Sequence, residues 1–166
     1  FTDANHGIGK FIFKGYYDHF KKTIEFIYNL KSKDTLWLIN PHPSSKDYNE
    51  NGQVEEIINK YKKENIMILP QNIKTVSAIK FSNLVITGRG TIGLEAACLG
   101  KKTLIAGYAI YEKLGFTIEP KNQIQYFKNL INKNNYKPLK NKIVKKILKY
   151  LYYFDQHNSN HLPTNP

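Results

Sequence analysis

The sequence has 166 residues, 41% of them hydrophobic, which is enough for a buried core and unlike a disordered tail or a collagen-like repeat. Its formal net charge of +12 at pH 7 favours anionic partners such as phosphates, anionic lipid or nucleic acid. No apolar run approaches the roughly 20 residues that a membrane-spanning helix needs, and residues 1–10 lack the apolar segment of a signal peptide.

The first half of the chain alternates helical and strand patterns. Apolar side chains recur at helical spacing from Tyr17 onward, and Pro41 and Pro70 each end a short apolar run that is typical of a buried strand. The predicted elements are a helix over 17–30, a strand over 35–40, a helix over 54–61, a strand over 66–69 and a short helix over 75–81.

The second half repeats this alternation. A strand passes through a glycine-rich turn into a helix, and Gly100 is placed to cap the end of that helix. The predicted elements are a strand over 83–87, a helix over 94–99, a strand over 103–106, a loop over 107–120 and helices over 124–131 and 143–151.

The order of these elements predicts the fold class. Short apolar strands that alternate with helices indicate a parallel sheet, buried on both sides by helices. We therefore expect an α/β fold, a Rossmann-like three-layer sandwich, followed by a flexible tail over 156–166. Ligands of such sheets bind beyond the carboxyl ends of the strands, so the residues that follow each strand form the candidate site.

The segment after the first predicted strand is Pro41-His42-Pro43-Ser44-Ser45. Two prolines restrict the backbone around His42, so its ring is held in place. An imidazole and two hydroxyl groups suit hydrogen bonding to a phosphate or to a nucleotide carbonyl. The alternative is a plain turn with an exposed histidine and a serine that caps the next helix.

The turn after the third predicted strand is Thr87-Gly88-Arg89-Gly90-Thr91. Glycine permits close approach of a ligand to the backbone, and a following helix N-terminus attracts anions. Arg89 is the only arginine of the chain, and arginine makes bidentate contacts to phosphate. The turn is not a Walker P-loop, and it does not follow the first strand, as a dinucleotide-binding turn does. A nucleotide sugar therefore fits this turn better than the ligands of those two motifs. The alternative is a tight turn that needs glycine for packing alone.

Further candidates lie on the next helix and after the fourth predicted strand. Glu95 is placed to accept hydrogen bonds from ribose hydroxyls, unless it simply faces solvent. Gly107, Tyr108 and Tyr111 are candidates for a sugar pocket, or for ordinary packing. No spacing of metal ligands is visible, so we expect no metal and no cofactor.

Two features concern the extent and compartment of the protein. A start at Phe1 instead of Met leads us to expect a piece of a longer protein. The single cysteine, Cys98, excludes an internal disulfide and favours a cytosolic setting, and its apolar neighbours favour a structural role.

Three motifs, in this order, resemble bacterial capsule polysaccharide biosynthesis proteins. They are His42-Pro-Ser-Ser45, the run from Thr87 through Gly93-Leu-Glu95 to Thr103, and the run from Ala106 to Thr117. Proteins of this family are GT-B glycosyltransferases, similar to Kdo transferases and more distantly to polysialyltransferases and teichoic-acid polymerases. The resemblance covers roughly residues 3–127.

The resemblance implies the C-terminal half of a GT-B fold, with the acceptor site and the catalytic base in an N-terminal domain outside this sequence. Residues 1–14 are then the interdomain crossover, and 15–155 the donor-nucleotide-binding domain. Carried over, His42 and Pro43 contact the nucleotide, Thr87 to Thr91 bind phosphate and Glu95 lies near the ribose.

The residues and the resemblance together predict transfer of a sugar, with inversion, from a CMP- or UDP-activated donor to a growing surface glycan. Helix amides, Arg89 and His42 would stabilise the leaving phosphate. The partners are then the nucleotide sugar, the glycan acceptor and the N-terminal domain. Two alternatives within enzymes are a CDP-glycerol-type polyol phosphate transferase and a sugar-nucleotide epimerase.

A last alternative rests on the basic end of the chain, where no Asp or Glu occurs between Lys121 and Phe154. A helix over 143–154 with Ile143, Ile147 and Leu151 on one face is typical of a membrane-surface module, although packing on its own domain is the preferred interpretation. We expect a cytoplasmic protein, with peripheral contact at the inner membrane as an open alternative. Nucleic acid is not expected, because no binding motif accompanies the charge.

Overall fold

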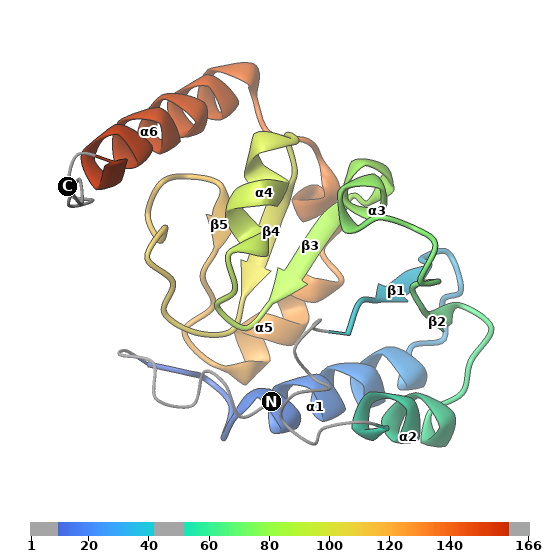
Figure 1. Ribbon diagram of the computed structural model, residues 1–166. Helices are drawn as coiled ribbons and strands as arrows, with labels where there is room; N and C mark the ends of the chain where they lie inside the picture. The colour runs from blue at the N-terminus through green and yellow to red at the C-terminus, as the bar shows by residue number, and fades with distance from the viewer. Residues whose placement is uncertain (1–9, 42–51, 160–166) are drawn as a thin grey trace, which may run out of the picture.

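The computed structural model describes the backbone of residues 10–41 and 52–159, and side chains as far as Tyr152. The predicted elements are present, with ends that shift by at most two residues except in the last helix (Figure 1). That helix was predicted over 143–151 and extends to Ser159, into the segment expected to be a tail. In chain order they are α1 Tyr16–Asn29, β1 Trp37–Ile39, α2 Gln53–Lys60, β2 Ile66–Ile68, α3 Thr75–Phe81, β3 Leu84–Thr87, α4 Ile92–Cys98, β4 Lys102–Ile105, β5 Thr117–Ile118, α5 Gln123–Leu130, the 3₁₀ helix η2 Lys133–Tyr136 and α6 Asn141–Ser159.

Two of these elements were not predicted. The strand β5 lies inside the segment expected to be a loop, and its two residues are too few to show a strand pattern. The 3₁₀ helix η2 lies between the last two predicted helices.

All strand pairs are parallel, as predicted. β1 pairs with β2, with Trp37 opposite Ile66, while β3, β4 and β5 form a second sheet in which Thr103 lies between Val85 and Thr117. Helices flank these short parallel sheets, so the chain has a Rossmann-like α/β fold (Figure 1). The strands thus pair in two groups, where the sequence predicted one sheet.

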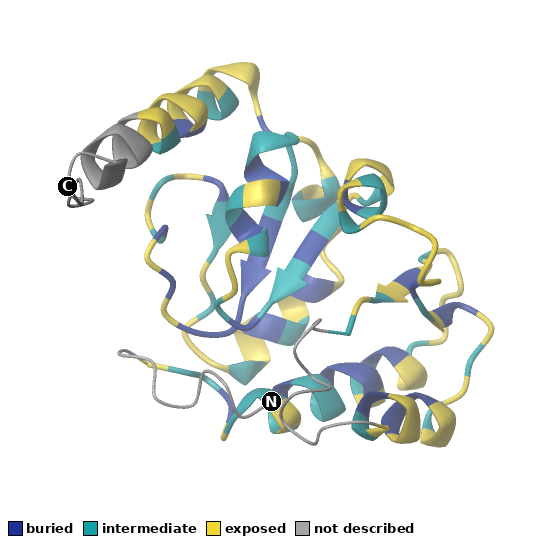
Figure 2. Ribbon diagram, viewed as in Figure 1, coloured by how far each residue is buried: buried dark blue, intermediate teal, exposed yellow. Residues whose placement is uncertain are grey.

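The prediction that each strand is buried on both faces is correct for β4 and wrong for β1 and β2. Thr103, Leu104 and Ile105 of β4 are all buried (Figure 2). By contrast, Leu38 of β1 is 40% exposed and Met67 of β2 is 42% exposed. An apolar run shows that a strand prefers a covered position, but it does not show whether a helix covers its second face.

One hydrophobic core joins the two sheets. Ile24 and Ile27 of α1 pack in the same cluster as Trp37 of β1, Leu104 of β4 and Tyr126 of α5. Among the described strands, no ladder of hydrogen bonds connects the two groups, so the apolar burial in this cluster is what holds them together.

The chain segment before α1 also packs into this domain. The amide of Ile12 donates to the carbonyl of Ala106 at 3.0 Å, and the amide of Tyr108 donates to the carbonyl of Lys10 at 2.9 Å. Phe11 forms an antiparallel bridge with Gly107. The end of the expected crossover segment therefore lies against the carboxyl end of β4.

The end of α4 confirms the predicted role of Gly100. This glycine has φ 76°, its amide donates to Ala97 at 3.0 Å, and the amide of Lys101 donates to Ala96 at 2.9 Å. The pair of bonds is a Schellman motif, which returns the chain directly into β4.

Candidate functional site: a glycine turn supported by aromatic side chains

The predicted phosphate-binding turn connects β3 to α4, at the carboxyl edge of the three-stranded sheet (Figure 1). The amide of Gly90 donates to Thr87 Oγ1 at 3.2 Å, and the Tyr111 hydroxyl donates to the carbonyl of Gly90 at 2.5 Å. The turn is therefore fixed both from within and from the loop that follows β4.

Tyr111 also explains a glycine in α4. A Cβ atom on Gly93 would overlap the hydroxyl end of the Tyr111 side chain. Tyr111 is itself buried, with its ring stacked on Phe116 at 5.6 Å between centroids, and burial raises the pKa of its hydroxyl to about 12. At neutral pH the hydroxyl is protonated, which lets it donate to Gly90.

The side chain of Arg89, in the middle of the turn, packs against the segment before α1 and the first residue of α1. Its guanidinium carbon is 5.0 Å from the centroid of the Phe11 ring and 5.9 Å from that of Tyr16. Cation–π contacts of this kind orient the guanidinium and offset part of the cost of its burial.

Two nitrogens of Arg89 stay without a protein acceptor. Nε and Nη1 are buried and make no hydrogen bond within the described part of the chain. A buried donor without an acceptor costs about 1–3 kcal/mol, and more on a charged group. Such donors are what an anionic ligand would complete, so Arg89 is the strongest single indication of a binding site in the described residues.

Gly88 and Gly107 make room for the rings that carry Arg89. A Cβ atom on Gly88 would overlap the Tyr16 ring, and one on Gly107 would overlap the Phe11 ring. In this structure both glycines therefore serve aromatic packing. The sequence analysis missed Phe11 and Tyr16, since nothing local connects them with a turn more than seventy residues away.

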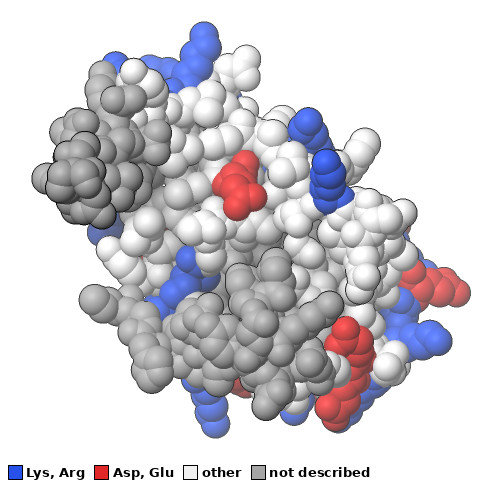
Figure 3. All heavy atoms as spheres, viewed as in Figure 1, with Lys and Arg blue, Asp and Glu red and all other residues white. Residues whose placement is uncertain are grey.

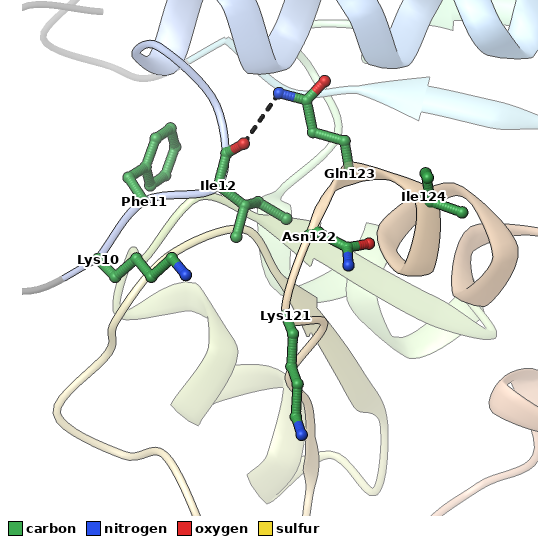
Figure 4. A pocket seen from close by; sticks show the side chains of 7 residues that line it. All are labelled: Lys10, Phe11, Ile12, Lys121, Asn122, Gln123 and Ile124. Carbon is green, nitrogen blue, oxygen red and sulfur yellow. Dashed lines mark hydrogen bonds between the residues drawn. The ribbon is translucent and has the colours of Figure 1, made fainter.

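A pocket of about 420 Å³ adjoins this arrangement at the same edge of the sheet (Figure 4). Phe11 lines the pocket and also carries Arg89 on its ring. The side-chain nitrogen Nε2 of Gln123 donates to the backbone carbonyl of Ile12 at 2.9 Å and so connects the two walls. The lining residues are Lys10, Phe11, Ile12, Lys121, Asn122, Gln123 and Ile124.

Lys10 and Lys121 bring two positive charges to this pocket from distant parts of the chain. Figure 4 shows them on its two walls, one before α1 and one before α5. The only signal in the sequence was that Lys121 begins the long stretch without acidic residues. Phe11 links the two features, since it lines the pocket with Lys10 and Lys121 and its ring contacts Arg89.

The remaining predicted residues fall in different environments. Thr91 and Glu95 are exposed, on the turn and the first turn of α4, where a ligand could reach them. Tyr108 is 46% exposed, beside Lys10. Since Gly107 accommodates Phe11 and Tyr111 is buried, Tyr108 is the member of the expected sugar pocket that is open to solvent. His42, Pro43, Ser44 and Ser45 lie outside the described residues.

Cys98 has the features of a structural residue. Its side chain is partly covered and packs at the edge of a cluster that contains Ala97 and Phe116. Burial raises the pKa of the thiol, and the nearby Glu95 carboxylate raises it further. A thiol that stays protonated is a poor nucleophile.

The described residues offer neither a metal site nor a membrane span. The residues described hold no group of three or more His, Cys, Asp and Glu side chains able to bind a metal ion. Among the helices formed by these residues, none has the length and the apolar character needed to cross a bilayer.

The sequence matches a known protein family. The family described as "Capsule polysaccharide biosynthesis protein" matches residues 10–158, which is most of the chain. No curated protein and no solved structure matches the sequence. The family match begins at Lys10, the residue where the chain joins the sheet edge, and includes the whole of the candidate site.

Proposed function

Since this chain belongs to the capsule polysaccharide biosynthesis family, we propose that it is the donor-binding domain of a glycosyltransferase. The proposed reaction moves a sugar from a CMP- or UDP-activated donor to a growing capsular polysaccharide. Family membership supports a role in capsule synthesis, and the observation that carries the finer proposal is Arg89 in the glycine turn, which has two buried nitrogens without an acceptor among the described residues.

The proposed chemistry is displacement at the anomeric carbon of the donor. An acceptor hydroxyl oxygen forms the new bond to that carbon, the bond to the phosphate oxygen breaks, and its electron pair leaves with the nucleotide phosphate. The hydroxyl proton passes to a base, which the proposal places in an N-terminal domain of a GT-B enzyme. The configuration at the anomeric carbon is inverted.

Arg89 is placed to stabilise the charge that develops on the leaving phosphate. Its guanidinium is held on the rings of Phe11 and Tyr16 before any ligand arrives, so little reorganisation is needed during the reaction. Lys10 and Lys121 add positive potential at the neighbouring pocket. No contribution of a metal ion is needed in this proposal.

The other residues take supporting roles. Tyr111 positions the turn through Gly90, and Thr87 closes the turn from within. Exposed Glu95 is proposed to bind the ribose, and Tyr108 the sugar. His42, Pro43, Ser44 and Ser45 remain proposed contacts of the nucleotide.

Calorimetric titration of CMP, CDP, UMP, UDP and GDP into the chain tests the proposal. We expect one nucleotide class to bind and Arg89→Ala to weaken it by about 10- to 100-fold, the loss that charged hydrogen bonds imply. Arg89→Lys should keep only part of the affinity for the nucleotide, because lysine lacks the planar pair of donors. Lys80→Ala is the matched control, because it removes one exposed positive charge on α3.

The outcomes separate the proposal from its rivals. Equal weakening by Arg89→Ala and Lys80→Ala would refute the role of Arg89. A preference for cytidine nucleotides leaves a CMP-sugar transferase and a CDP-glycerol-type transferase, which release CMP alike. Analysis of the product formed from each donor by the longer protein distinguishes a sugar from a polyol phosphate, and turnover of a nucleotide sugar without any acceptor would favour an epimerase.

A further inference from the structure

The C-terminal helix α6 has one face that is already occupied. Ile147 is buried, and Ile143, Val144 and Leu151 pack against the same cluster, which includes Phe116. The preferred interpretation of this apolar face, packing on its own domain, is confirmed. Insertion of Ile143, Ile147 and Leu151 into a membrane is excluded while the domain is folded in this way.

The opposite side of α6 is exposed and strongly basic. We call it the outer face of α6, and it carries four exposed lysines together with two exposed apolar side chains. Its residues are Lys142, Lys145, Lys146, Leu148, Lys149 and Tyr152.

The sequence around these lysines is poor in acidic residues. No Asp or Glu occurs between Glu119 and Asp155, so neither α5, η2 nor the described side chains of α6 contribute a negative charge. Figure 3 agrees, with blue side chains over α6 and no red ones on its described part in that view. The outer face therefore projects a positive potential into solvent.

Leu148 and Tyr152 decide which polyanion this face suits best. They are 49% and 63% exposed, and a spacing of four residues places them next to each other on the helix, with Lys145 and Lys149 alongside. At a bilayer surface, a leucine and a tyrosine enter the headgroup region while lysines reach outward to the lipid phosphates. A nucleic-acid backbone offers a leucine no such environment, and this face has no arginine.

We propose that the outer face of α6 binds the surface of an anionic lipid bilayer. Binding combines the attraction of four lysines to acidic headgroups with shallow burial of Leu148 and Tyr152. The contact is peripheral, because the apolar face of the helix stays on its own domain. This proposal rests on the charge and exposure of α6 alone and is independent of the glycosyltransferase proposal.

Co-sedimentation of the chain with vesicles tests this proposal. We expect binding to vesicles of phosphatidylcholine mixed with phosphatidylglycerol, little binding to pure phosphatidylcholine, and a steep loss of binding with added salt. Changing Lys142, Lys145, Lys146 and Lys149 together to Gln should weaken binding on the order of a thousandfold. Leu148→Ser with Tyr152→Ser should weaken it at unchanged charge.

The control removes the same charge elsewhere. Lys31, Lys62, Lys74 and Lys80 are exposed and lie outside α6, and changing all four to Gln gives the same net charge as the outer-face variant. Circular dichroism of each variant shows whether it is folded. Equal loss of binding in both lysine variants would mean that overall charge is responsible, and would overturn the proposal. Tighter binding to a double-stranded DNA oligonucleotide than to the anionic vesicles would also overturn it.

Discussion

The Tyr111 hydroxyl donates a hydrogen bond to the carbonyl of Gly90, 21 residues earlier in the chain, and so joins the loop after β4 to the turn after β3. Two loops at the carboxyl edge of the sheet are thereby connected directly. The same tyrosine lies so close to Gly93 that no side chain fits there, which accounts for a small residue inside α4.

Tyr111→Phe is expected to lower the free energy of unfolding by about 1 kcal/mol. The ring and its stacking on Phe116 remain, and solvent can replace the lost donor at Gly90, which is exposed. Urea denaturation of the two proteins measures the difference. If Tyr111 also positions the turn, the variant binds nucleotide more weakly than its stability alone explains, whereas unchanged affinity would limit Tyr111 to a role in stability.

Gly88→Ala should destabilise the domain by about 1–3 kcal/mol, the usual cost of overpacking. The new methyl group would overlap the Tyr16 ring, which in turn lies under Arg89. Gly90→Ala in the same turn is the matched control, since its nearest neighbours are Thr87 Oγ1 at 3.1 Å and Ile92 Cγ2 at 3.9 Å. The midpoint temperature of thermal unfolding should be much lower for Gly88→Ala than for Gly90→Ala, and the reverse order would contradict the described packing.

Stability should fall as the pH is lowered from about 6.5 to 4, because of His19. Its Nε2 lies 2.8 Å from the Tyr126 hydroxyl, and burial lowers the pKa of the imidazole from 6.5 to about 4, although Asp18 nearby acts in the opposite direction. In this pH range the unfolded chain binds a proton that the folded protein excludes, so protons favour unfolding. The loss in the free energy of unfolding reaches roughly 3 kcal/mol once the pH is below both pKa values of His19, that of the unfolded chain and that of the folded protein.

The His19 prediction is checked by urea denaturation at several pH values between 7 and 4. His19→Gln should be less stable at pH 7 because it packs less well against Tyr126, but it should lose the steep dependence below pH 6.5. A variant with the same slope as the original chain would show that other groups cause the dependence.

Ile147→Ala and Leu148→Ala form a matched pair on α6. Ile147 is buried in the cluster that holds the helix on α4, so its loss should cost about 2–5 kcal/mol. Leu148 is 49% exposed, and its change should cost less than about 0.5 kcal/mol. Chemical denaturation distinguishes them, and similar costs would mean that α6 does not pack on this face.

The sequence by itself determined the α/β order, the parallel pairing and the place of the candidate turn. Helix and strand patterns depend on neighbours two to four residues apart, so they are visible locally. Proline and glycine add local signals, as Gly100 does at the end of α4. The sequence did not show that β1 and β2 each leave one face exposed, since an apolar run carries no information on what covers it.

Only the tertiary structure decided how the site is built. Phe11 and Tyr16 under Arg89, and Lys10 opposite Lys121, are contacts between segments that lie far apart in the chain. Such pairs leave no periodic pattern, because each residue is chosen for the shape and charge of a partner that only folding brings near. Gly88 was visible in the sequence as part of the turn, but the reason for a glycine there, room for the ring of Tyr16 at the start of α1, exists only once the chain is folded.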